Sequence, residues 1–175
     1  VMPGAKWFSD SELNYAQNLL KGDPDQIAII SVGENISPKT LTFKELNHKV
    51  SSVQKGLSKL GVKKGTIVSG FVPNCAETVI SMLAVSSLGG VWTSCSPDFG
   101  ANGVVDRFGQ VNPHILITSN GYSYNGKLFK LEEKVNGVLD SIESIKHIIE
   151  IEYVDIKSNF RHDSIIPYDD ILNEE

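Results

Sequence analysis

The feature that most constrains the fold is an alternation of short β-rich runs with longer segments of helical periodicity. The runs expected to form strands are residues 26–32, 66–72, 91–94, 114–118 and 146–151. The segments that join them are too long for the tight turns of antiparallel hairpins. The sequence therefore predicts an α/β fold: a doubly wound, mostly parallel sheet of four or five strands with flanking helices.

Helical spacing of apolar residues predicts five helices, at residues 11–20, 42–60, 74–88, 102–110 and 129–142. The second has the clearest signals, because Thr42 and Glu45 can form a capping box and Gly61 favours a helix end. Its apolar residues from Leu46 to Leu60 recur every three or four positions, so they should share one buried face. The sequence Asn74-Cys-Ala-Glu77 predicts a cap for the third helix, with Glu77 in a capping role.

The chain divides into an N-terminal arm, residues 1–25, and an α/β subdomain, residues 26–175. In the arm, Leu13, Ala16, Leu19 and Leu20 should form the apolar face of the short helix. Residues 35–39 are expected to form a turn, and the tail after about residue 154 is expected to be irregular. No repeat or low-complexity segment occurs.

Composition argues against several classes of function. The formal net charge is −5 and no basic patch is visible, so nucleic acid is not an expected partner. No apolar run is long enough to span a membrane, and no signal peptide is visible at the N-terminus. Cys75 and Cys95 form no paired motif, which favours reduced thiols and a cytoplasmic setting. The four histidines lack metal-ligand spacing, so no metal site is expected. Fingerprints for dinucleotide binding, nucleoside-triphosphate binding and serine hydrolysis do not occur.

The run Trp92-Thr-Ser-Cys-Ser-Pro-Asp-Phe-Gly100 is unusual, because it joins a buried strand to a helix. Pro97 disfavours helix at Ser96, and Asp98 or Asn102 could cap the helix that follows. In open α/β sheets, ligands bind at the carboxyl ends of strands, and helix N-termini attract anions. Two interpretations stay open: an anion-holding loop, or a tight connection with no ligand.

A second loop is expected at residues 121–127, where Asn125-Gly126 signals a turn. Lys127 could meet a phosphate there, and Tyr122 or Tyr124 could stack on a base. The alternative is a solvated surface loop.

Eight segments stand out in order along the chain: Lys6–Phe8, Leu13–Leu20, Leu41–Leu46, Gly61–Gly65, Pro73–Thr78, Ser87–Gly100, Asp106–Gln110 and Tyr124–Lys127. Together they resemble the N-terminal region of the acetoacetyl-CoA synthetases, which belong to the acyl-adenylate-forming ligases. The resemblance covers almost the whole chain and weakens after about Val154. SCSPDFG, DRF and YNGK are the most specific to these enzymes, whereas PNxxE and LTFxEL occur more widely in the superfamily.

The resemblance implies a reaction in which ATP activates acetoacetate as an acyl-adenylate and the thiol of CoA attacks it, giving acetoacetyl-CoA and AMP. It implies ATP, Mg²⁺ and CoA as cofactors of the parent enzyme, and its remaining subdomains as partners. Ser96, Pro97, Asp98 and Lys127 would lie on the CoA side of the site. Tyr124 stands where relatives carry a basic residue.

The resemblance assigns no catalytic residue to this chain. The Ser/Thr/Gly-rich ATP loop, the later ATP-site motifs and the C-terminal domain with its adenylation lysine do not occur in these residues. We therefore expect the chain alone to be inactive, with CoA as the one ligand it could hold. A non-catalytic remnant or interaction module is the alternative, and an independent nucleotide-binding module is a third hypothesis. A truncated sheet would expose an edge strand and apolar helix faces, so marginal solubility is expected.

Overall fold

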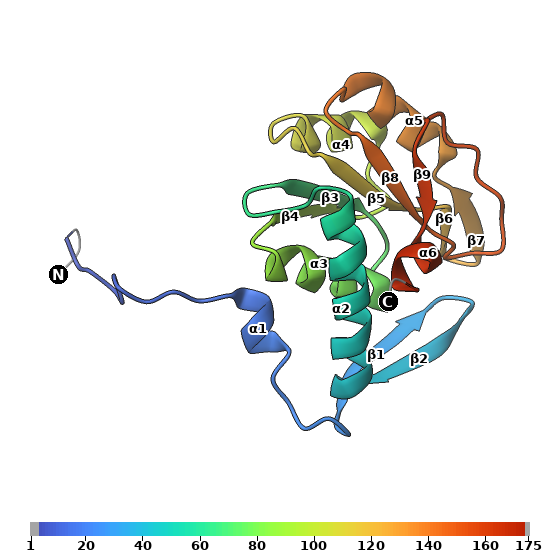
Figure 1. Cartoon of the computed structure of the whole chain (residues 1–175). Helices are drawn as coiled ribbons and strands as arrows, with labels where there is room; N and C mark the ends of the chain where they lie inside the picture. Colours follow the sequence, from blue (N-terminus) through green and yellow to red (C-terminus); the bar gives the residue numbers. More distant parts are fainter. Residues whose placement is uncertain (1–3, 174–175) are drawn as a thin grey trace.

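Five parallel strands form the central sheet, in the order β4-β3-β5-β8-β9. The computed structural model describes residues 4–173, and Figure 1 shows the sheet between two groups of helices. The predicted α/β fold with a parallel sheet is confirmed. Its strands are β3 (Ile67–Phe71), β4 (Val91–Cys95), β5 (Ile115–Ser119), β8 (His147–Ile151) and β9 (Ile165–Pro167).

Helices cover both faces of this sheet and bury two separate apolar cores. One face packs against α2 (Phe43–Lys59), α3 (Ala76–Ser87) and α6 (Tyr168–Leu172). The other packs against α4 (Ala101–Phe108) and α5 (Glu132–Ser141). Successive strand residues point to opposite faces, so in β5 Ile115 and Ile117 enter the first core while Leu116 enters the second. This arrangement is the doubly wound fold that the alternation predicted.

The signals for α2 are confirmed. The Thr42 side chain accepts a hydrogen bond from the Glu45 backbone N–H, and the Glu45 carboxylate accepts one from the Thr42 backbone N–H. Leu46, Val50, Val53 and Leu57 are buried on one face. Gly61 follows the helix with φ +84°, a conformation that favours glycine.

The structure contains two antiparallel hairpins that the sequence analysis did not predict. The first pairs β1 (Ile27–Gly33) with β2 (Ile36–Thr42), so β1 lies outside the parallel sheet and residues 36–39 are strand, not turn. Pro38 is tolerated because this hairpin is a separate two-stranded sheet with open edges. The second pairs β6 (Gly121–Tyr124) with β7 (Lys127–Lys130). Phe129, expected in a helix, therefore lies in a strand.

The tail after residue 154 is only partly irregular. It supplies β9 and α6, and α6 is fixed by the buried Tyr168. The Tyr168 hydroxyl donates to the Glu77 carbonyl at 3.1 Å and accepts from Ser81 Oγ at 3.1 Å. The last segment thereby adds β9 beside β8, and β9 becomes the edge strand on that side of the sheet.

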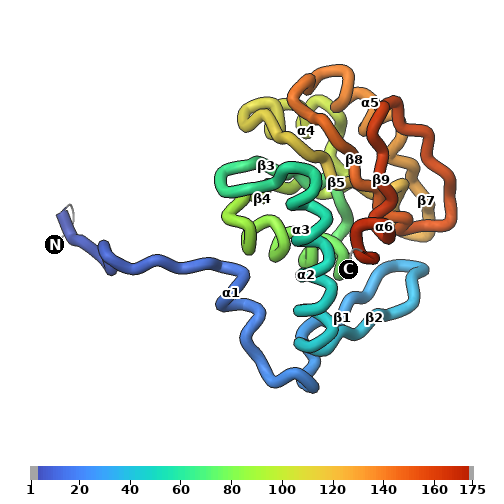
Figure 2. The backbone as a smooth tube through the Cα atoms, in the orientation of Figure 1, coloured from blue at the N-terminus to red at the C-terminus, as the bar shows by residue number. Residues whose placement is uncertain are grey.

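The described residues of the N-terminal arm that precede Asn14 project away from the body, as Figure 2 shows. The arm's helix α1 is shorter than expected, Tyr15–Leu19, because Asn14 forms its N-cap. Only Ala16 is buried, while the side chains of Leu13 and Leu19 are 84% and 46% exposed, so the predicted apolar face is wrong at those two residues. The Asn14 side chain also donates to the carbonyls of Ser86 and Ser87, which joins the arm to α3.

Candidate functional site

The loop 96–100 follows β4 at the carboxyl end of the parallel sheet, and α4 begins directly after it. Pro97 is buried, whereas Ser96 and Asp98 are exposed. The predicted cap is wrong, because Gly100 is the N-cap and no side chain bonds the first turn. The Phe99 backbone N–H instead donates to the Ser96 carbonyl at 3.1 Å, closing a turn. The guanidinium of Arg107 lies 4.9 Å from the centre of the Phe99 ring, a contact in which the aromatic face attracts the cation.

The cap predicted for the third helix also differs from the structure. Cys75 is the N-cap of α3 and makes no capping hydrogen bond with its side chain. The Glu77 carboxylate reaches Lys39 of the first hairpin at 2.8 Å, so its main partner is long-range.

The second candidate segment, residues 121–127, contains the first strand and the turn of the hairpin β6–β7. The predicted turn at Asn125-Gly126 is confirmed, with φ values of +50° and +72°. Tyr124 and Lys127 face each other across this turn, and both are exposed. The Glu34 carboxylate of the first hairpin accepts hydrogen bonds from the backbone N–H groups of Asn125 and Gly126. The two hairpins are therefore joined tip to tip.

One residue that sequence reasoning missed links the two candidate segments. The Nζ of Lys134, on α5, donates to the Pro97 carbonyl at 2.9 Å and the Asp98 carbonyl at 3.5 Å. It also lies 5.7 Å from the centre of the Tyr122 ring at the base of the hairpin. Within residues 4–173, no hydrogen bond or ion pair joins Tyr124 or Lys127 directly to Ser96, Pro97 or Asp98. The structure thus links the loop 96–100 to the hairpin β6–β7 through Lys134, and not by a direct bond between the predicted residues.

A groove of about 530 Å³ runs beside Lys127 and between the two hairpins. Its walls include Ser37, Ser123 and residues 153–155. Asn120 holds this last segment: its side-chain amide donates to the carbonyls of Val154 and Ile156 and accepts from the backbone N–H groups of Tyr153 and Val154. Lys127 is the groove's cation without a hydrogen bond or ion pair in the described structure, whereas Lys39 is bound to Glu77.

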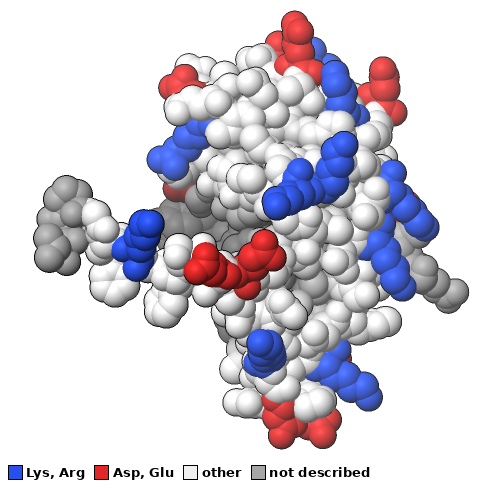
Figure 3. All heavy atoms as spheres, turned by 60° about the vertical axis from the view of Figure 1, so that its left-hand side comes forward, with Lys and Arg blue, Asp and Glu red and all other residues white. Residues whose placement is uncertain are grey.

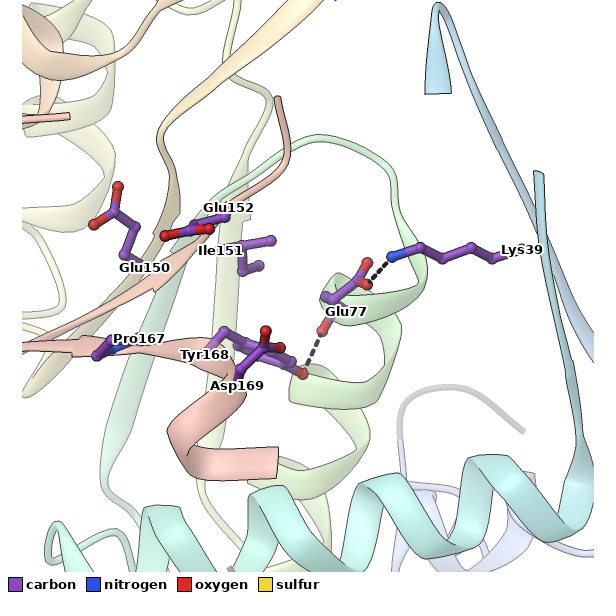
Figure 4. A pocket seen from close by; sticks show the side chains of 8 residues that line it. All are labelled: Lys39, Glu77, Glu150, Ile151, Glu152, Pro167, Tyr168 and Asp169. Carbon is purple, nitrogen blue, oxygen red and sulfur yellow. Dashed lines mark hydrogen bonds and ion pairs between the residues drawn. The ribbon is translucent and has the colours of Figure 1, made fainter. Parts of the chain in front are cut away.

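A smaller cavity of about 200 Å³ lies at the carboxyl ends of β8 and β9 (Figure 4). Glu150, Glu152 and Asp169 line it together with the Lys39–Glu77 ion pair. Burial raises the pKa of Glu77, but the hydrogen bond and charge of Lys39 outweigh burial and lower the pKa below its usual value. The hydrogen bond to Glu77 correspondingly raises the pKa of Lys39. Lys39 and Glu77 therefore form a structural ion pair, and the other charged side chains that line the cavity are acidic.

The remaining reactive side chains are poorly suited to catalysis. Burial raises the pKa of the Cys75 thiol to about 11 and also raises that of Cys95, so both thiols are protonated at neutral pH. His114 and His147 approach each other, with ring centres 5.8 Å apart. In the described part of the chain, no group of three His, Cys, Asp or Glu side chains could hold a metal ion.

The face shown in Figure 3 carries both basic and acidic side chains. Among the described helices, none has the length and apolar character needed to cross a membrane.

Comparisons with known proteins show the family to which the chain belongs. The chain matches the family described as "AMP-binding enzyme" over residues 17–168. Acetoacetyl-CoA synthetase from Xenopus tropicalis is 42% identical over 153 residues, which cover 85% of this chain and 22% of that protein. The Rhizobium meliloti enzyme is 43% identical over 141 residues, covering 81% of this chain and 22% of its own length. The chain thus spans about a fifth of the curated relatives it matches.

A relative with a different substrate is also similar. Malonamoyl-CoA synthetase from Penicillium aethiopicum is 34% identical over 155 residues, covering 85% of this chain and 21% of that protein. Among solved structures, acetoacetyl-CoA synthetase from Streptomyces lividans matches with a TM-score of 0.90 and 37% identity. That match covers 98% of this chain and 27% of the other.

Proposed function

Because this chain belongs to the AMP-binding enzyme family and is homologous to the N-terminal part of acetoacetyl-CoA synthetases, we propose that it is the first subdomain of an acetoacetate–CoA ligase. The complete enzyme would use ATP to convert acetoacetate into its acyl-adenylate, releasing diphosphate. The CoA thiol would then displace AMP and form acetoacetyl-CoA. The observation that carries the proposal is identity of about 40% to several such synthetases along most of the chain.

We assign no catalytic step to these residues. The Ser/Thr/Gly-rich loop to which the resemblance assigns the ATP phosphates does not occur in these residues, so we propose that other parts of the enzyme hold ATP and its Mg²⁺. The proposed contribution is a surface for the adenosine and phosphate end of CoA, formed by Ser96, Pro97 and Asp98 on the loop and by Tyr124 and Lys127 on the hairpin. Support comes from the exposed ammonium of Lys127, which can attract a phosphate without breaking an existing ion pair. With two free thiols, the protein suits the reducing cytosol.

The test uses the full-length protein that carries these residues. AMP formation is measured with ATP, acetoacetate and CoA, and adenylation is measured separately as acetoacetate-dependent exchange of pyrophosphate into ATP. Lys127→Ala should raise the KM for CoA about tenfold, since one charge-assisted phosphate contact is lost. Pyrophosphate exchange should stay unchanged, because it needs no CoA.

The matched control is Lys130→Ala, which removes the same charge from the other end of β7 and should leave the KM for CoA unchanged. A CoA analogue without its 3′-phosphate then locates the contact: it should bind the wild-type protein and Lys127→Ala equally if Lys127 meets the 3′-phosphate, and unequally if Lys127 meets the diphosphate. Absence of acetoacetate-dependent AMP formation in the wild type would exclude the ligase and favour a non-catalytic interaction module. Equal KM values for CoA would remove Lys127 from the site.

A further inference from the structure

Lys134 occupies a position that a helix alone does not favour. It is the third residue of α5, next to Glu132 and Glu133 in the first turn. Acidic residues suit this end of a helix, but a cation there is unfavourable because the helix N-terminus carries a partial positive charge. The half-buried Lys134 side chain also gives up rotational freedom. A compensating interaction must therefore come from outside the helix.

That interaction joins two segments distant in sequence. Lys134 Nζ donates to the carbonyl of Pro97, 37 residues away, at 2.9 Å, and to the neighbouring Asp98 carbonyl at 3.5 Å. The same ammonium faces the Tyr122 ring, which stacks on Phe129 with ring centres 5.1 Å apart. Burial and the nearby Asp98 carboxylate raise the pKa of Tyr122, which indicates that the loop and the base of the hairpin share one environment.

The two bonded carbonyls lie just before α4, where no side chain caps the helix. Without Lys134, only the Phe99–Ser96 backbone hydrogen bond and the burial of Pro97 would hold the loop, so that hydrogen bond should open more often and the link to the hairpin would be lost. We infer that Lys134 is a positioning residue that fixes the loop 96–100 relative to the hairpin β6–β7, so that both present one surface to CoA. This inference rests on the proposed function for its ligand, while the coupling itself is independent of it.

The experiment compares wild type with Lys134→Met in the full-length protein, by kinetics and by hydrogen exchange. The KM for CoA should rise about tenfold, because a charged hydrogen bond that orders the loop is lost. The KM for ATP and the pyrophosphate exchange rate should not change. Exchange of the Phe99 amide hydrogen should become about tenfold faster as the loop opens more often.

Three further variants make the result specific. Lys134→Arg keeps a cation that can reach both carbonyls and should restore the KM for CoA. Lys130→Met removes a nearby exposed charge and should change neither measurement. If Lys134→Met does not fold, Lys134→Gln keeps an N–H donor without the charge and should show the same changes in weaker form.

The experiment distinguishes a failure of this inference from a failure of the proposed function. If the wild type lacks ligase activity, the proposed function fails, whereas faster exchange at Phe99 in Lys134→Met would still support the coupling. An unchanged Phe99 exchange rate overturns the inference. A normal KM for CoA despite faster exchange also overturns it, as does an equal rise in the KM for ATP.

Discussion

The central sheet and the hairpin β6–β7 are adjacent in the chain but are held by different forces. Every residue of β5 is buried, whereas every residue of β7 is exposed. The sheet is stabilised by two apolar cores, one on each face. The hairpin depends on a two-residue turn, the stacked pair Tyr122–Phe129 and a few polar contacts. A substitution in the hairpin therefore perturbs the fold far less than one in the sheet.

This difference bears on function, because the candidate residues lie outside the cores. Ser96 and Asp98 are exposed on a loop, and Tyr124 and Lys127 are exposed on the hairpin. Ligand-contacting residues on such segments can change while a rigid scaffold keeps their positions. The chain is similar to an acetoacetyl-CoA synthetase and to a malonamoyl-CoA synthetase alike, which fits a shared scaffold.

The largest contrast is expected from truncating one phenylalanine in each region. Phe108, the last residue of α4, is fully buried in the core that α4 and α5 form with the sheet, so Phe108→Ala should lower the free energy of unfolding by about 3–5 kcal/mol. Phe129 is 38% exposed and packs on one ring, so Phe129→Ala should cost about 1 kcal/mol. Urea denaturation of both variants measures the difference. Equal losses would mean that the hairpin is part of the cooperative core.

A smaller effect is expected at the junction of the two regions. Asn120 lies between β5 and β6, is 2% exposed, and satisfies four backbone groups of residues 153–156. Asn120→Ala leaves these partly buried groups without partners, so it should lower the free energy of unfolding by about 2–3 kcal/mol.

The control for this junction is Asn159→Ala, because the Asn159 side chain is exposed. Its free energy of unfolding, measured by urea denaturation, should match that of the wild type to within about 0.5 kcal/mol. If Asn120→Ala is equally mild, water replaces the four hydrogen bonds and the junction is flexible.

The regular part of the fold was predictable because its causes are local. Thr42 and Glu45 are three residues apart, and the apolar face from Leu46 to Leu57 repeats within one helix. The apolar strands β5 and β8 stood out because both of their faces are buried. These signals established the doubly wound sheet and most of its helices.

The hairpins were missed because their signals are weak or misleading. Ser37-Pro38 favours a turn, yet an isolated two-stranded sheet accepts proline. Phe129 continues an apolar spacing into α5, but the turn at Asn125-Gly126 sends it into β7. The short β9 becomes a strand only because β8 lies beside it, and no local pattern reports that neighbour.

The links within the candidate site were invisible for the same reason. Lys134 reads as an ordinary charged residue of a helix, and Glu34 as an ordinary turn residue. Their partners lie 36–37 and 91–92 residues away. A sequence can show that Lys127 follows a turn, but only the folded chain shows what holds the turn in place.

The smallest expected effect on stability is at the tip of the hairpin. Glu34→Gln keeps the shape of the side chain but removes the charge that accepts two backbone N–H groups. Because this contact is exposed, the free energy of unfolding should change by about 0.5 kcal/mol or less. Exchange of the Gly126 amide hydrogen should nevertheless become faster, since a neutral amide is a weaker acceptor than a carboxylate. Glu12→Gln, an exposed substitution in the arm, should leave that exchange rate unchanged. A global loss of stability in Glu34→Gln would show that the hairpin tips support the sheet, and the division between the two regions would then be wrong.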